Sequence, residues 1–192
     1  ETATLLARAL ELRPRVWRPF FTDDDGSPHE ASINELYARG IVNGCVQGDA
    51  PKFCPDDVLT RGQMASLLQR AIGLPNSSED AFVDDDGSVH ERAINAIAEA
   101  GITTGCDPGN PTIYCPTEAV TRGQMAVFLV RAFNLPDARS DHFGDDSGLF
   151  YEDAANSLFE AGVTLGCETG RYCGQRPITR AEVATMLVRV LD

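Results

Sequence analysis

Lysine is almost absent from this chain of 192 residues: Lys52 stands alone against fifteen arginines. The formal net charge is −13. Because a protein that binds a phosphate backbone needs a basic surface, this charge argues against nucleic acid as a partner. No apolar run approaches the roughly 20 residues that a membrane-spanning helix needs, so membrane insertion is not expected either.

Catalytic signatures are missing as well. The sequence contains no Ser-His-Asp arrangement, no glycine-rich phosphate loop and no metalloprotease helix motif. We therefore expect a non-catalytic chain. His29 and His90 occupy equivalent places in a repeat, but Tyr151 takes the third such place. We interpret the two histidines as polar residues on the solvent side.

The dominant feature is one pattern that occurs three times, opening at Phe21, Phe82 and Phe143, with a spacing of 61 residues. Each copy contains two helical patterns joined by a loop. We therefore predict an all-α fold with long loops, built from three tandem helix-loop-helix repeats. The expected boundaries are residues 21–74 for repeat 1, 75–135 for a linker plus repeat 2, and 136–192 for a linker plus repeat 3.

The first ten residues align position by position with residues 182–191. We expect residues 1–20 to be the C-terminal helix of a preceding unit plus a linker, which completes a unit in another molecule or caps the fold in its own. The chain has no initiator Met, so we interpret it as a piece of a longer polypeptide whose signal peptide has been removed. For Trp17, in the linker, we favour sealing the core over covering a groove.

Six cysteines fall as one pair in each repeat, with eight, eight and five residues between the partners. Zinc sites typically show two-residue spacings or accompanying histidines, and these pairs have neither. The spacing favours three local disulfides, which form in an oxidising, extracytoplasmic compartment. The pairs are Cys45 with Cys54, Cys106 with Cys115, and Cys167 with Cys173.

The two helices of each repeat carry start and stop signals. In the first copy Ser27 is a candidate N-cap, followed by Pro28 and by Glu30, and Gly40 is a candidate left-handed C-cap. In the third copy Leu149 replaces the capping serine, so we expect its first helix to fray more or to dock differently. The second helices begin with Thr-x-x-Gln or Thr-x-x-Glu capping boxes at Thr60, Thr121 and Thr179.

These motifs resemble S-layer homology motifs: the Phe-x-Asp opening, the helix that ends at Gly-Ile, and the helix that starts with Thr-Arg-Ala-Glu. Residues 179–182 match the last signature completely, whereas the other two copies read Thr-Arg-Gly-Gln. The resemblance covers nearly all of residues 21–192. The repeats are similar to exported actinobacterial versions of the motif, which have a disulfide inside each repeat. It implies a pseudo-threefold arrangement around a central helical bundle, with grooves between the motifs.

The resemblance also implies a function. Such modules tether exported proteins to the cell wall by binding its secondary polysaccharides, often pyruvylated ones. The arginine of the signature faces the groove in that family, which implies ligand binding by Arg61, Arg122 and Arg180. An aromatic residue, usually Trp, commonly starts the first helix, and only Phe150 supplies a stacking surface here, because Pro28 and Val89 take the other two places.

Physical reasoning about the arginines leaves two alternatives. A cation in the first turn of a helix lies against the positive end of the helix dipole, so a nearby anion should compensate it. That anion is either the ligand or an internal acid such as Asp57 or Glu118.

Acidic turns precede the first helix of each repeat. Carboxylates clustered in a glycine turn suit calcium, although the spacing is not that of an EF-hand. The alternative is that these acids only complement the helix dipole and cap the helix. The candidate calcium ligands are Asp23, Asp25, Asp84, Asp86 and Asp145.

Together these features predict an extracellular protein of the cell wall or cell surface. We expect a non-catalytic module that anchors its parent protein to cell-wall polysaccharide through grooves between repeats. The alternative is a structural module that assembles an extracellular layer or filament by contacts with other cell-surface subunits or by self-association. A third alternative is that the chain tethers an enzyme whose catalytic domain precedes Glu1.

Overall fold

The computed structural model describes residues 20–192. The predictions for the N-terminal helix and for Trp17 concern residues 1–19 and lie outside this range. The described part is all-helical, with isolated β-bridges and no strand, so the predicted fold class is confirmed. Its helices are α2 (Glu30–Ala38), α3 (Arg61–Ile72), α4 (Glu91–Glu99), α5 (Arg122–Phe133), α6 (Glu152–Glu160) and α7 (Arg180–Leu191).

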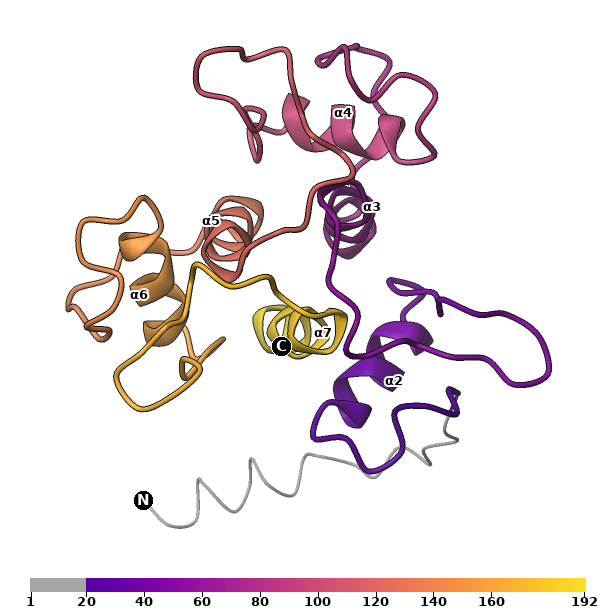
Figure 1. Ribbon diagram of the computed structural model, residues 1–192, viewed down its shortest axis with the longest axis horizontal. Coiled ribbons are helices and arrows are strands. Elements are labelled where there is room, and N and C mark those ends of the chain that lie inside the picture. Colours follow the sequence, from indigo (N-terminus) through magenta and orange to yellow (C-terminus); the bar gives the residue numbers. More distant parts are fainter. Residues whose placement is uncertain (1–19) are drawn as a thin grey trace.

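The three repeats form a pseudo-threefold ring (Figure 1). The longer helices α3, α5 and α7 lie at the centre, and α2, α4 and α6 lie outside them with their loops. Each central helix packs against the outer helix of the next repeat: α3 on α4, α5 on α6, and α7 back on α2. The ring is therefore closed by a contact between the two ends of the described chain.

A cycle of three backbone hydrogen bonds joins the repeats just before the central helices. Leu59 donates to the carbonyl of Ile178, Ile178 to that of Val120, and Val120 to that of Leu59, at 3.1, 3.0 and 2.8 Å. All three side chains are buried. The segments that lead into α3, α5 and α7 are thus fixed to one another, which places the first turns of these helices at the interfaces between repeats.

The predicted capping boxes of the central helices are confirmed. In each, the Thr hydroxyl accepts from the backbone N–H three residues later, and the Gln or Glu side chain returns to the Thr N–H. The C-cap glycine after the first helix is also confirmed, because Gly40 has a φ of +71° and Ile41 donates to Leu36 as in a Schellman ending.

The predicted N-caps of the outer helices are wrong. Helix α2 begins at Glu30, after a turn through Ser27 and Pro28, and its N-cap residue His29 makes no side-chain capping bond. The Ser27 hydroxyl accepts from the N–H of His29, only two residues on, at 3.2 Å. Fraying in the third copy is not seen, because α6, without the serine, has nine residues like α2 and α4.

The three predicted disulfides are confirmed. Each is held by an aspartate of the acidic turn, whose two carboxylate oxygens accept from consecutive backbone N–H groups. Asp84, for example, accepts from Tyr114 and Cys115, both at 2.7 Å. Across residues 20–192 no helix combines the length and the apolar character that crossing a membrane requires.

Candidate functional site: grooves between the repeats

The three signature arginines fasten each central helix to the loop of the next repeat. Arg61 donates from Nε to the carbonyl of Tyr114 at 2.7 Å and from Nη2 to that of Gly105 at 3.1 Å. Its guanidinium lies 4.6 Å from the centre of the Tyr114 ring. Arg180 makes similar contacts with repeat 1, donating to the carbonyls of Phe53 and Asn43. The arginines therefore close the ring.

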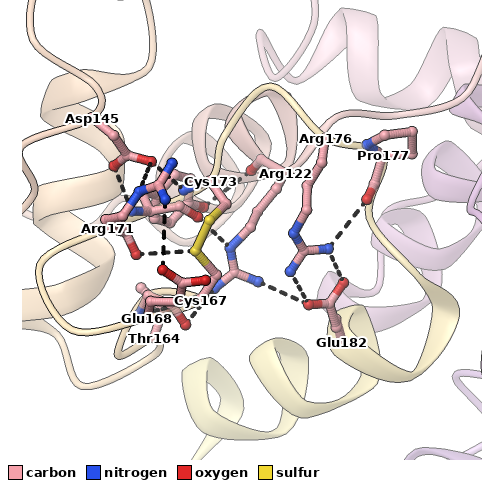
Figure 2. The surroundings of a disulfide bond; sticks show 12 residues. Arg122, Asp145, Thr164, Cys167, Glu168, Arg171, Cys173, Arg176, Pro177 and Glu182 are labelled. Carbon is pink, nitrogen blue, oxygen red and sulfur yellow. Dashed lines mark hydrogen bonds and ion pairs between the residues drawn. A yellow bond between two sulfur atoms is a disulfide. The ribbon is translucent and has the colours of Figure 1, made fainter.

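Arg122 makes the most extensive set of these contacts (Figure 2). It donates to the carbonyls of Tyr172 and Gly166 and, at 2.8 Å, to the Thr164 hydroxyl. A fourth contact joins it to Glu182 at 3.4 Å. Only 4% of the Arg122 residue is exposed. Most hydrogen-bonding groups of this guanidinium are thus used in contacts within the protein.

Backbone carbonyls, rather than the acids expected from the sequence, carry most of the compensation for these cations. Asp57 and Glu118 lie close enough to raise the pKa of Arg180 and Arg61, but burial outweighs them and lowers both pKa values. Direct ligand binding by Arg61, Arg122 and Arg180 stays a prediction. Their observed contacts position the groove walls.

The interpretation of the histidines as solvent-side residues is wrong. His29 and His90 are half-buried and bridge repeats, with His29 bonded to Thr185 of α7 at 2.7 Å and His90 to Ser66 of α3 at 2.8 Å. At the interface between repeats 2 and 3, Tyr151 replaces the histidine and is buried. Its ring packs against the backbone of Gly123.

A first groove of about 310 Å³ lies between repeats 1 and 2. Its walls are formed by α3, the loop of repeat 1, the start of α4 and Arg180 of α7. It contains two arginines and no acid. The lining residues are Val42, Asn43, Gly44, Leu59, Gln63, Ser66, Leu67, Arg70, Val89, His90 and Arg180.

A second groove of about 300 Å³ repeats this construction between repeats 2 and 3. It also has two arginines and no acid, and the predicted aromatic, Phe150, lines it with 71% of its surface exposed. The lining residues are Arg61, Thr103, Thr104, Gly105, Cys106, Pro108, Gln124, Val127, Phe128, Arg131 and Phe150.

The third interface, where α7 of repeat 3 packs against α2 of repeat 1, differs from the other two in charge. Glu182 stands where α3 and α5 have Gln63 and Gln124, and its carboxylate accepts from Arg176 and Arg122 (Figure 2). Burial alone would raise the pKa of Glu182, but the hydrogen bonds from Arg176 and Thr179 hold it below its usual value. An ionised acid therefore neutralises arginine at this interface, whereas no acid lines the first or the second groove.

Arg70 and Arg131 are functional candidates that sequence reasoning missed. They occupy equivalent places in the last turns of α3 and α5, where a cation is ordinarily explained by the helix dipole. Arg131 donates one hydrogen bond to the carbonyl of Ile102 at 3.2 Å. Arg70 has no hydrogen-bond or ion-pair partner within residues 20–192. Arg70 lines the first groove described above and Arg131 lines the second.

The acidic turns contain two kinds of aspartate. Asp23, Asp84 and Asp145 clamp the disulfide loops through paired hydrogen bonds to the backbone. The residues that follow them are buried, and neither carboxylate oxygen of any of the three has a hydrogen-bond partner in the described structure. These buried residues are Asp24, Asp85 and Asp146. They were not among the predicted calcium ligands.

Comparison with known proteins gives a family match for two of the three repeats. Residues 20–65 and 82–126 match the S-layer homology domain. The chain is 31% identical over 168 residues to an endoglucanase of Bacillus sp. (strain KSM-635), covering 83% of this chain and 17% of that protein. It is 28% identical over 165 residues to an S-layer protein of Bacillus thuringiensis subsp. finitimus, covering 82% and 19%. An S-layer protein of Bacillus licheniformis is 26% identical over 192 residues, covering 97% and 21%.

Proposed function

Because two segments of this chain match the S-layer homology domain, we propose that the chain is a non-catalytic module that anchors its parent protein to cell-wall polysaccharide. Its location is the extracellular cell surface. We also propose that residues 143–192 form a third copy of the domain, since they have the same helices, capping box, disulfide and arginine contact as the other two. The chain spans about a fifth of the length of the relatives it matches.

The charge of the first and second grooves carries this proposal. In a chain with a net charge of −13, an anionic wall polymer is repelled by most of the surface. Each of these grooves nevertheless contains two arginines and no acidic lining residue. A glycan that bears carboxylate or phosphate groups would find in them the planar, multiply donating cations that such groups prefer.

The two grooves are expected to bind with different strength. Carbohydrate rings stack on aromatic side chains, and Phe150 offers such a surface in the second groove, whereas Val89 takes the equivalent place in the first. The second groove is therefore the stronger candidate for a specific sugar. The third interface, in which Glu182 neutralises arginine, is the weakest candidate.

The endoglucanase relative bears on what the module anchors. The chain covers only 17% of that protein, so the likeness accounts for a small part of it. We propose that the chain is the tether of its own parent protein, whether that parent is an enzyme or a subunit of a surface layer.

Replacing Arg70 and Arg131 together by glutamine should weaken binding to isolated cell walls at least about 10-fold, because each charged hydrogen bond to an anion contributes about 1.5–3 kcal/mol. The measurement is co-sedimentation with walls before and after chemical removal of the secondary polysaccharide. Both side chains are exposed at the helix ends, so the fold should persist. Arg92→Gln, an exposed arginine outside both grooves, is the matched control.

Binding by the wild type that disappears with the polysaccharide would support the anchor. Equal sedimentation with intact and stripped walls, or equal loss in the Arg92→Gln control, would reject polysaccharide binding through these grooves. The assembly of a surface layer would then be the remaining function.

A further inference from the structure

The turn before α4 brings three carboxylates together around a buried one. Asp80, Asp85 and Asp86 each offer an oxygen, and these oxygens all lie within 4.8 Å of one another. Asp85 is 1% exposed, whereas Asp80 and Asp86 are at the surface. Three negative groups at this separation repel one another unless a cation or protons neutralise them.

The environment of Asp85 is an independent indication that this cluster binds a cation. Both of its carboxylate oxygens are buried and have no hydrogen-bond partner within residues 20–192. Leaving a buried carboxylate without partners is costly, and native proteins rarely do so without a ligand or an ion that completes the site. No ion pair joins Asp80, Asp85 or Asp86 to an arginine in the described part of the chain.

The surroundings add further oxygen atoms and a route from solvent. A hollow of about 420 Å³ adjoins the cluster and is lined by Asp80, Glu91 and Asn95 among others. Glu91 uses one carboxylate oxygen to accept from Gly87 at 2.9 Å. A hydrated ion could enter from this side and keep some of its water ligands.

We propose that Asp80, Asp85 and Asp86 bind a calcium ion in the turn before α4. All donors in the cluster are hard oxygens, with no thiolate or imidazole, which selects calcium or magnesium over transition metals. Three carboxylates favour calcium, because magnesium demands a near-ideal octahedron and usually retains water in place of all but one or two carboxylates. Of the ligands expected from the sequence, Asp86 belongs to this site and Asp84 clamps the loop beside it.

The other repeats lack part of this cluster, although both keep the buried aspartate. Pro19 stands at the place of Asp80 in repeat 1, and Ser147 stands at the place of Asp86 in repeat 3. Repeat 2 is therefore the copy with the complete set of three acids. A single strong calcium site in the chain is the expected stoichiometry.

The test is calorimetric titration of the chain with calcium after treatment with EGTA, together with thermal unfolding in both states. One strong site is expected, and calcium at about 100 times its Kd should raise the Tm by roughly 5 °C or more. Asp80→Asn and Asp86→Asn, which change exposed side chains, should each weaken calcium binding at least about 10-fold. Asp25→Asn, the counterpart of Asp86 in repeat 1, should leave the affinity unchanged.

Asp85→Asn separates ion binding from a purely structural role. It should abolish the calcium-dependent rise in Tm and, in EGTA, unfold at a higher temperature than the wild type, because it removes a buried charge. The proposal is overturned if millimolar calcium produces neither heat nor a shift in Tm. It is equally overturned if magnesium binds as tightly as calcium, or if Asp25→Asn weakens binding as much as Asp86→Asn does.

Discussion

Replacing Arg122 by methionine should lower the free energy of unfolding by about 3–5 kcal/mol, the cost of removing one partner from a buried ionic network. Methionine fills much of the space of the aliphatic stem but donates no hydrogen bond. The carbonyls of Tyr172 and Gly166, the Thr164 hydroxyl and the Glu182 carboxylate would each lose a donor. Urea unfolding measures the loss.

Arg171→Met is the matched control for this substitution. Arg171 lies in the loop of repeat 3 that Arg122 contacts, but its side chain is 57% exposed and its ion pairs with Asp145 and Glu168 are 3.7 and 3.6 Å long. Exposed pairs of this kind contribute about 1 kcal/mol or less. If both variants lost the same stability, Arg122 would not be the fastener between repeats 2 and 3.

Tyr151→Ala should destabilise the chain by about 3–5 kcal/mol, the range measured for truncating large buried rings. The Tyr151 ring is enclosed by the backbones of Gly123 and Gly174, where an added Cβ would lie 2.3 Å from ring atoms. Helix α6 thus docks on α5 through a ring that fits only against glycine. Removing the ring leaves a cavity that these backbones cannot close.

Tyr151→Phe separates the ring from its hydroxyl and should leave the stability unchanged or slightly raised, because the buried hydroxyl has no hydrogen-bond partner within residues 20–192. Gly123→Ala gives a reciprocal test. Alanine ordinarily stabilises a helix interior relative to glycine, but here its Cβ would collide with the Tyr151 ring and destabilise the chain. An increase in stability for Gly123→Ala in thermal unfolding would contradict this packing.

Local signals in the sequence are sufficient to predict the central helices and the disulfides. The capping boxes at Thr60, Thr121 and Thr179 involve residues three apart, and each cysteine pair closes a short loop, so neither depends on the distant parts of the chain. The outer helices were less predictable. Their serines form a turn ahead of the helix, which the same Ser-x-x-Glu pattern does not distinguish from a cap.

The site residues depend on contacts between repeats, which a local pattern does not contain. Arg61 is compensated by carbonyls more than 40 residues away in the sequence, and its own helix contains no sign of them. The pairing of His90 with Ser66 was hidden for the same reason. Among three consecutive aspartates, the sequence also could not indicate that Asp85 is the buried one.

Chemical-shift mapping by NMR with solubilised wall polysaccharide tests the central claim most directly. We expect the largest shifts along α3 and α5 at Gln63–Arg70 and Gln124–Arg131, with the Phe150 resonances moving in the same titration. Shifts at the third interface, around Glu182, should be smaller. Shifts confined to surfaces outside the two grooves, or none at saturating polysaccharide, would contradict the account.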